Sequence, residues 1–302
     1  MVNSTTAGDS SGDANIWDWH INIGNLQGLP EWSSVPRLDG GAVDYAAVKA
    51  AGYSAVQVME PSQDIADAGL AMSGMGFVTL PEQADAVAEA HKGWGFTVST
   101  WHVGTGMETD AEMDALAGAV LEASARHGLP IHIETHRATI TQDMRRTLDL
   151  IARMPDLTFN ADLSHYYTGA EMPYGDIAAK FDRLQPLFER VRYLHGRIGT
   201  PCAMQVPVAV DDSRAFVGHF RTMWGACARG FAQTAQPGER LAFAPELLPY
   251  SVEHNGESVD IYYARHIDGE EESDRWEQAQ VLREIARQAA DTASRQAVPG
   301  EG

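Results

Sequence analysis

Short apolar segments with the composition of β-strands alternate with helical segments along almost the whole chain. Eight such segments occur, and most are continuously apolar, which is typical of parallel strands that are buried on both faces of a sheet. They span Ile16–Asn22, Ser54–Met59, Leu70–Met75, Phe96–His102, Pro130–Glu134, Leu157–Asp162, Val191–Arg197 and Leu241–Glu246.

Between these segments the sequence predicts helices, most of them Ala-rich and amphipathic. The alternation of strands and helices predicts a parallel sheet, and eight repeats predict closure into one (β/α)8 TIM barrel over residues 15–298. A doubly wound open sheet is the alternative, but the SGMGF segment at 73–77 is too short for a glycine-rich phosphate loop. We expect Asp110 to cap one helix without a full capping box. The expected helices are Asp44–Ala51, Glu82–Trp94, Ala111–Arg126, Gln142–Arg153, Tyr174–Arg190, Arg214–Thr234 and Ser273–Gln296.

The composition restricts the possible binding partners and the cellular compartment of the protein. The formal net charge of −20 argues against nucleic-acid binding and against docking on anionic lipid, because both need clustered Lys and Arg. The two cysteines, Cys202 and Cys227, provide no disulfide framework and no cysteine metal site, which suits a reducing compartment. Residues 1–14 are polar and lack an apolar core, so we expect a disordered tail rather than a signal peptide. No apolar run approaches the length of a membrane span, and we expect a cytoplasmic protein.

Four of the predicted strands end in a side chain that binds metals, namely Glu134, Asp162, His195 and Glu246. The carboxyl ends of barrel strands all point to one face, where active sites are built. Three carboxylates converging there without a cation would repel, each pair by roughly 4 kcal/mol at about 4 Å. One imidazole and three oxygen ligands form a hard site, so we expect one divalent ion, first Mn²⁺, with Mg²⁺, Co²⁺ or Zn²⁺ as alternatives. In the competing interpretation, each residue caps a strand or pairs with an arginine.

More polar side chains lie beside these strand ends. His136 follows Glu134 closely, His165 follows Asp162 by three residues, and Arg197 lies two residues beyond His195. We expect these residues to bind substrate hydroxyl and carbonyl groups, and the alternative for each of them is a structural role. Because 51 residues separate His195 from Glu246, we also expect a loop inserted after His195 over the site. The candidate substrate-binding residues are His102, His136, His165, Arg197, Trp101 and Gln205.

Four motifs carry a family resemblance: IETHRATITQD at 133–143, FNADLSHYY at 159–167, YLHGRIGTPCAMQVP at 193–207 and FAPELLPY at 243–250. In this order they resemble the xylose isomerase-like TIM-barrel superfamily, which includes sugar isomerases, ketose 3-epimerases and inosose dehydratase. The resemblance extends from about Ile16 to Ala290. It implies that the four strand-end residues are the metal ligands and that His165 and Arg197 hold substrate oxygens. The loop at Gly199–Val208 resembles a bacterial branch of sugar phosphate isomerases and epimerases.

The expected function is a metal-dependent isomerase or epimerase that acts on a small-molecule carbohydrate. The metal would stabilise an ene-diolate while Glu134 and Glu246 move protons beside a carbonyl, with Glu246 as the first base. A lyase or dehydratase acting on a keto-sugar, keto-glycoside or inosose uses the same first step and is the main alternative. A non-catalytic sugar-binding barrel is a further one, while the negative charge disfavours a nuclease. By analogy with relatives, the chain would form a homo-oligomer.

Overall fold

The computed structural model describes residues 16–254 and 256–297. Eight parallel strands follow one another in chain order around a closed barrel, and the first strand pairs with the eighth through Trp17 and Leu241. The predicted (β/α)8 barrel is therefore confirmed, and the tail expected at residues 1–14 lies outside the described residues. The strands are β1 Trp17–Asn22, β2 Ala55–Val58, β3 Ala71–Val78, β4 Ser99–Val103, β5 Ile131–Glu134, β6 Phe159–Ala161, β7 Val191–Gly196 and β8 Leu241–Pro245.

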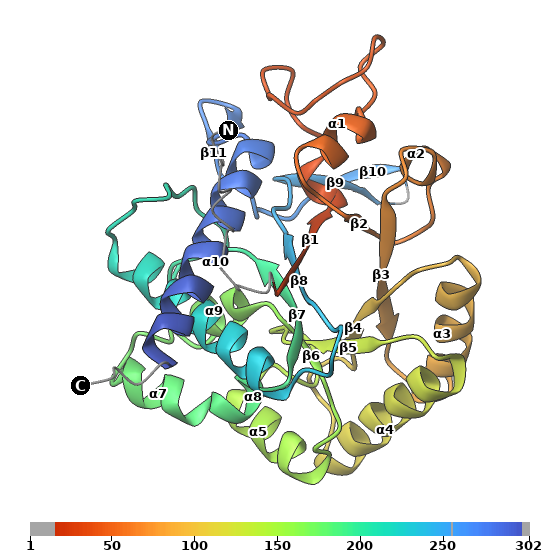
Figure 1. Ribbon diagram of the computed structural model, residues 1–302, viewed down its shortest axis with the longest axis vertical. Helices are drawn as coiled ribbons and strands as arrows, with labels where there is room; N and C mark the ends of the chain where they lie inside the picture. Colours follow the sequence, from red (N-terminus) through yellow and green to blue (C-terminus); the bar gives the residue numbers. More distant parts are fainter. Residues whose placement is uncertain (1–15, 255, 298–302) are drawn as a thin grey trace, which may run out of the picture.

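Helices surround the strands on the outside of the barrel (Figure 1). The predicted helix at 174–190 is divided into α7 and α8 at Leu184, since Pro186 lies in the first turn of α8, where proline is tolerated. The helices are α1 Tyr45–Ala50, α2 Gln63–Asp67, α3 Gln83–Gly93, α4 Asp110–His127, α5 Met144–Arg153, α6 Leu163–Gly169, α7 Ile177–Arg183, α8 Gln185–Phe188, α9 Ala215–Thr234 and α10 Arg275–Ala297, with a 3₁₀ turn η1 at Ile23–Asn25.

The N-terminus of α4 differs from the sequence prediction. Thr109, and not Asp110, is the N-cap, and it forms a full capping box with Glu112. The Thr109 hydroxyl accepts from the backbone N–H of Glu112, while the Glu112 carboxylate accepts from the backbone N–H of Thr109. Helix α4 therefore begins one residue earlier than predicted.

Two short hairpins follow β8, and the sequence analysis did not predict them. Strand β9 (Ser251–His254) pairs with β10 (Glu257–Asp260), and β11 (His266–Ile267) pairs with β12 (Glu270–Glu271). A long connection also joins β7 to α9, at the position where an inserted loop was expected. The inserted segments after β7 and β8 thus both follow carboxyl ends of strands, at the active-site face of such barrels.

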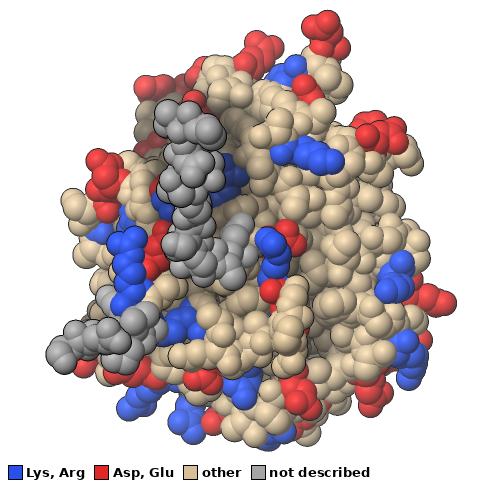
Figure 2. Space-filling model, viewed as in Figure 1, with Lys and Arg blue, Asp and Glu red and all other residues tan. Residues whose placement is uncertain are grey.

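The largest hydrophobic core fills the space between the barrel and its helices. Trp224 of α9 and Phe243 of β8 are fully buried there, with ring centroids 5.4 Å apart and nearly perpendicular planes. On the outer surface in Figure 2, basic side chains are interspersed with acidic ones and form no continuous basic area. Among the described residues, no helix is both long and apolar enough to cross a membrane.

Two of the three glycines of helix α9 lie in contrasting surroundings, which provides a matched test of its packing. A Cβ at Gly230 would lie 2.7 Å from the Phe188 carbonyl oxygen and 2.7 Å from the Glu189 Cα, whereas a Cβ at Gly218 would meet nothing within 4 Å. Gly230→Ala should lower the free energy of unfolding by about 1–3 kcal/mol, because the neighbouring backbone must move. Gly218→Ala should raise it by up to about 1 kcal/mol, since alanine favours a helix interior.

Urea denaturation, followed by circular dichroism, measures the free energy of unfolding of both variants. A Gly230→Ala variant as stable as the wild type would contradict the close contact between α8 and α9.

Candidate metal centre

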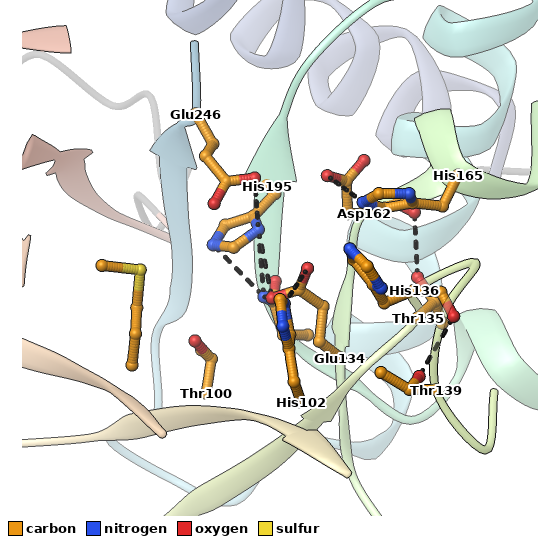
Figure 3. A network of polar contacts seen from close by, with 12 residues as sticks. Thr100, His102, Glu134, Thr135, His136, Thr139, Asp162, His165, His195 and Glu246 are labelled. Carbon is orange, nitrogen blue, oxygen red and sulfur yellow. Dashed lines mark hydrogen bonds and ion pairs between the residues drawn. The ribbon is translucent and has the colours of Figure 1, made fainter. Parts of the chain in front are cut away.

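The ends of β5, β7 and β8 and the residue after β6 bring four ionisable side chains together. Each of Glu134, Asp162, His195 and Glu246 offers one ligand atom, and these atoms all lie within 4.8 Å of one another. All four side chains are buried, and Figure 3 shows them turned toward a common point. We call this group the acidic centre. The strand register explains the convergence, since Glu134 pairs with Asn160 and His195 with Ala244 at the same end of the sheet.

The two ring nitrogens of His195 both lie 3.2 Å from Asn160 Nδ2, but their other partners differ. Nδ1 lies 3.2 Å from a Glu246 oxygen and 3.5 Å from a Glu134 oxygen. Nε2 lies 3.0 Å from Gln57 Oε1, which is a hydrogen-bond acceptor, so we assign the Nε2 proton to this bond. Nδ1 is then the ring atom that faces the carboxylates. A second nitrogen fixed by an outer hydrogen bond is usual for histidines that bind metals.

Burial and charge act in opposite directions on the titration of the acidic centre. Burial lowers the pKa of His195, but the nearby Glu246 and Glu134 outweigh it and raise that pKa to about 9. Burial raises the pKa of Asp162, but Arg197 and His165 outweigh it and lower that pKa to about 2. The pKa of Glu134 is also lowered well below its usual value, against burial, by His102 and His195. Without a metal, a proton on His195 therefore offsets part of the negative charge.

Arg197 is fully buried and contributes a second positive charge to the acidic centre. Its Nη2 contacts an Asp162 oxygen and donates to Glu246 Oε2 over 2.8 Å, while Nε donates to Ser164 Oγ over 3.1 Å. The arginine pairing considered in the sequence analysis is thus present for two of the three carboxylates. A divalent cation and Arg197 would together balance three carboxylates and a neutral imidazole. The donor set therefore fits a hard divalent cation.

Three buried polar atoms around the acidic centre have no hydrogen-bond partner among the described residues. They are Asn160 Oδ1, His165 Nδ1 and Arg197 Nη1. Buried polar groups in folded proteins are nearly always paired. A group of unpaired atoms beside four potential metal ligands is what a site for a polar small molecule would present.

Three histidine rings extend from Glu134 toward Asp162 (Figure 3). His102 Nε2 lies 3.0 Å from Glu134 Oε1, and ring centroids are 4.2 Å apart for His102 and His136 and 3.9 Å apart for His136 and His165. Burial lowers the pKa of His102, but Glu134 outweighs it and raises that pKa, whereas burial and His102 lower the pKa of His136 to about 4. Of the three rings, His102 next to Glu134 is therefore the one most readily protonated.

Two of the expected substrate-binding residues have other contacts. Trp101 does not face the acidic centre, because side chains alternate along a strand and Trp101 points outward from β4, opposite to Thr100 and His102. It is fully buried, and its indole N–H donates to Ser99 Oγ over 2.7 Å. Gln205 binds the backbone of Leu248 at both ends of its amide, over 2.9 and 3.1 Å. It thereby connects the loop after β7 to the segment after β8.

The sequence analysis missed a layer of amides that lies beside the acidic centre. Asn22 Nδ2 donates to Gln57 Oε1 over 2.9 Å and to Glu246 Oε1 over 3.4 Å. Gln57 Nε2 donates to Thr100 Oγ1 over 2.9 Å, and Asn160 Nδ2 donates to Glu134 Oε2 over 3.0 Å. Gln57 and Asn160 are polar residues within otherwise apolar buried strands, and this is the signal that would have found them.

A cavity of about 660 Å³ opens beside the acidic centre, and its lining includes Glu134, Glu246, His102 and Thr100. Of the four members of the acidic centre, the two glutamates thus line this cavity. A small molecule in the cavity would meet two carboxylates that adjoin the same imidazole. The fold and this site together define a (β/α)8 barrel with a candidate metal centre at the carboxyl ends of its strands.

No protein-family model matches the sequence, and no curated protein matches it. Solved structures resemble it in fold, among them three that match nearly the full length of the chain. A sugar phosphate isomerase/epimerase from Parabacteroides distasonis is 13% identical with a TM-score of 0.51, over 96% of this chain and 99% of that one. A D-tagatose 3-epimerase-like protein is 10% identical with a TM-score of 0.51, over 93% and 100% of the two chains.

The third is a xylose isomerase-like TIM barrel protein from Mycobacterium smegmatis in complex with magnesium. It is 12% identical with a TM-score of 0.50, over 92% of this chain and 98% of that one. The predicted resemblance to xylose isomerase-like TIM barrels is therefore confirmed for the fold, over nearly the full length of these proteins.

The raised pKa of His195 predicts that metal binding depends on pH. At pH 7 the metal-free imidazole holds a proton because its pKa is about 9, and a metal needs the neutral ring. Binding of Mn²⁺ at pH 7 should therefore release about one proton. The apparent affinity should rise roughly tenfold per pH unit and level off near pH 9.

Isothermal titration calorimetry in buffers of different ionisation enthalpy measures the released proton. A His127→Gln variant, altered at the far end of α4, should behave like the wild type. Affinity that stays constant from pH 6 to 9 would show that His195 is not a ligand.

Proposed function

We propose that this protein is a divalent-metal-dependent isomerase or epimerase that transfers protons beside a carbonyl group of a carbohydrate. The observation that carries the proposal is the placement of Glu134 and Glu246. They come from β5 and β8, both adjoin His195 Nδ1, and both line the cavity of about 660 Å³. Two carboxylates beside one small-molecule cavity are suited to remove a proton from carbon and to return one.

The acidic centre would hold the ion, Mn²⁺ first and Mg²⁺, Co²⁺ or Zn²⁺ as alternatives. When bound, the ion would supply Lewis-acid stabilisation of the negative charge that develops as a proton leaves carbon. Arg197 holds Glu246 through Oε2, and Asn22 contacts the same carboxylate at Oε1. These contacts orient Glu246 toward the cavity, where it would act as the base.

Glu134 is suited to return the proton. His102 holds a proton at Nε2, 3.0 Å from Glu134 Oε1, and both residues line the cavity. A proton passed to Glu134 or given up directly at His102 can reach a substrate carbon or oxygen there. His165 and Arg197 carry the unpaired atoms Nδ1 and Nη1, which we assign to binding of substrate oxygens, and His136 lies between His102 and His165 in the ring row.

The three solved structures support this proposal through their descriptions, which are an isomerase/epimerase of sugar phosphates, a 3-epimerase-like protein and a magnesium complex. The proposed substrate is a small carbohydrate or cyclic polyol with a carbonyl group.

The His102–Glu134 pair also favours a second reaction. A proton held at His102 Nε2 can protonate a leaving hydroxyl, so removal of a proton by Glu246 would then end in loss of water. The protein would in that case be a lyase or dehydratase. A time course followed by NMR distinguishes the two, because only the lyase yields an unsaturated product.

Replacement of Glu246 by glutamine tests the proposed base. With Mn²⁺ present, the wild type should exchange solvent deuterium into one member of a panel of ketoses, inososes and 3-keto-glycosides. Glu246→Gln should lower that rate by at least about 10²–10⁴-fold, because the amide cannot accept the proton. The measurement is proton NMR in deuterated water.

The control is Glu122→Gln, an exposed position on α4 outside the centre, and it should exchange at the wild-type rate. Circular dichroism should show both variants folded. Full exchange by Glu246→Gln would remove this residue from the reaction.

A further inference from the structure

The cavity beside the acidic centre has two chemically different sides. Glu134, Glu246, His102 and Thr100 are polar, as are Asn22, Gln27 and Ser251, but much of the remaining lining is large and apolar. These apolar side chains come from η1, from β3, and from the segments after β2 and β8. They are Ile23, Met59, Met75, Phe77, Leu248 and Val252.

The apolar side of the cavity is open and lies next to the proposed proton-transfer pair. Met59 is 54% exposed and Phe77 is 52% exposed. The Phe77 ring lies 4.9 Å from the His102 ring, edge to face, and His102 contacts Glu134. A contiguous exposed apolar surface beside a reactive pair indicates contact with an apolar part of a ligand.

The apolar side of the cavity offers no charged partner to an anionic group. Among the described residues that line the cavity there is no lysine or arginine, so a phosphate held on this side would lose its hydration without gaining an ion pair. The arginines are found elsewhere, around a second cavity of about 710 Å³ that includes Arg137, Arg214 and Arg265 and neither glutamate. A sugar phosphate placed with its carbonyl beside Glu134 and Glu246 would therefore turn its phosphate toward methionine and phenylalanine, or leave it unpaired.

The size of the cavity also favours a ligand with an apolar part. A volume of about 660 Å³ lies in the range that accommodates drug-sized ligands. A monosaccharide bound at the carboxylates would leave the apolar side uncovered. Its hydroxyl groups would also find no hydrogen-bond partners on methionine, phenylalanine and leucine side chains.

We propose that the substrate is a carbohydrate or cyclic polyol that carries an uncharged apolar substituent, aromatic in kind, which lies against Met59, Met75 and Phe77. This inference rests on the proposed function for the position of the reacting carbonyl. It names a substrate class that differs from sugar phosphates. The polar half of such a molecule meets the acidic centre and His102, and its apolar half covers the open side of the cavity.

Affinity measurements on the metal-loaded full chain test the substituent without relying on turnover. The probes are phenyl β-D-glucopyranoside, methyl β-D-glucopyranoside and glucose 6-phosphate, which share the glucose ring and carry a phenyl group at O1, a methyl group at O1 and a phosphate at O6, respectively. The phenyl glycoside should bind at least about tenfold more tightly than the methyl glycoside, because an aromatic ring leaves water. Glucose 6-phosphate should bind no more tightly than the methyl glycoside.

Two variants test whether the phenyl group of the ligand binds beside Phe77. Phe77→Ala should reduce the phenyl-to-methyl affinity ratio by about fivefold or more, whereas Tyr174→Ala should leave it unchanged. Tyr174 is a matched control because it is an aromatic residue, 82% exposed, that does not line the cavity. Circular dichroism and thermal denaturation would verify that both variants are folded.

The inference is overturned if the ratio is near one, if glucose 6-phosphate binds most tightly, or if Phe77→Ala keeps the ratio. A failure of the proposed reaction would be seen separately, as no deuterium exchange with any keto compound of the panel. The affinity ratio would still decide whether the cavity binds an aromatic group.

Discussion

Three buried carboxylates share one small volume at the mouth of the barrel, and the surrounding structure depends on how their charge is balanced. At separations near 4 Å each pair would repel by roughly 4 kcal/mol. In the described part of the chain, this negative charge is offset by Arg197, by a protonated His195 and by amide donors from Asn22 and Asn160. The proton on His195 is the part of this balance that a divalent cation can replace.

The barrel makes this concentration of charge possible because its strands are in register. Each member of the acidic centre lies at or directly after the carboxyl end of a strand. The flanking apolar residues pack between these strands and the surrounding helices. Asp162 has a second role, since its Oδ1 accepts from the Ser164 backbone N–H and caps α6. The amide of Gln57 fixes His195 from the other side. Position and protonation of the potential ligands are thus set by their neighbours.

Much of this arrangement was predictable from the sequence. Continuously apolar strands ending in Glu, Asp and His determine both the barrel and the face on which those residues meet. The strand-end pattern placed Trp101 and His102 together, but the two side chains point to opposite faces of β4, and of the two it is His102 that contacts the acidic centre. The amide contacts of Gln205 depend on tertiary packing of loops, which strand and helix periodicity does not encode. The hairpin of β11 and β12 had a local signal, because Asp268 and Gly269 between its strands both have positive φ, as in the Asp-Gly turns that favour hairpins. The division of α7 from α8 had a local signal in Pro186.

The proposed chemistry and the proposed substrate meet in one cavity with a charged side and an apolar side. Both depend on the acidic centre binding an ion. The most direct test is anomalous diffraction at the manganese edge from crystals grown with Mn²⁺. This account predicts one strong peak per chain, within coordination distance of Glu134, Asp162, His195 and Glu246. Absence of a peak among these four residues at saturating Mn²⁺ would contradict it.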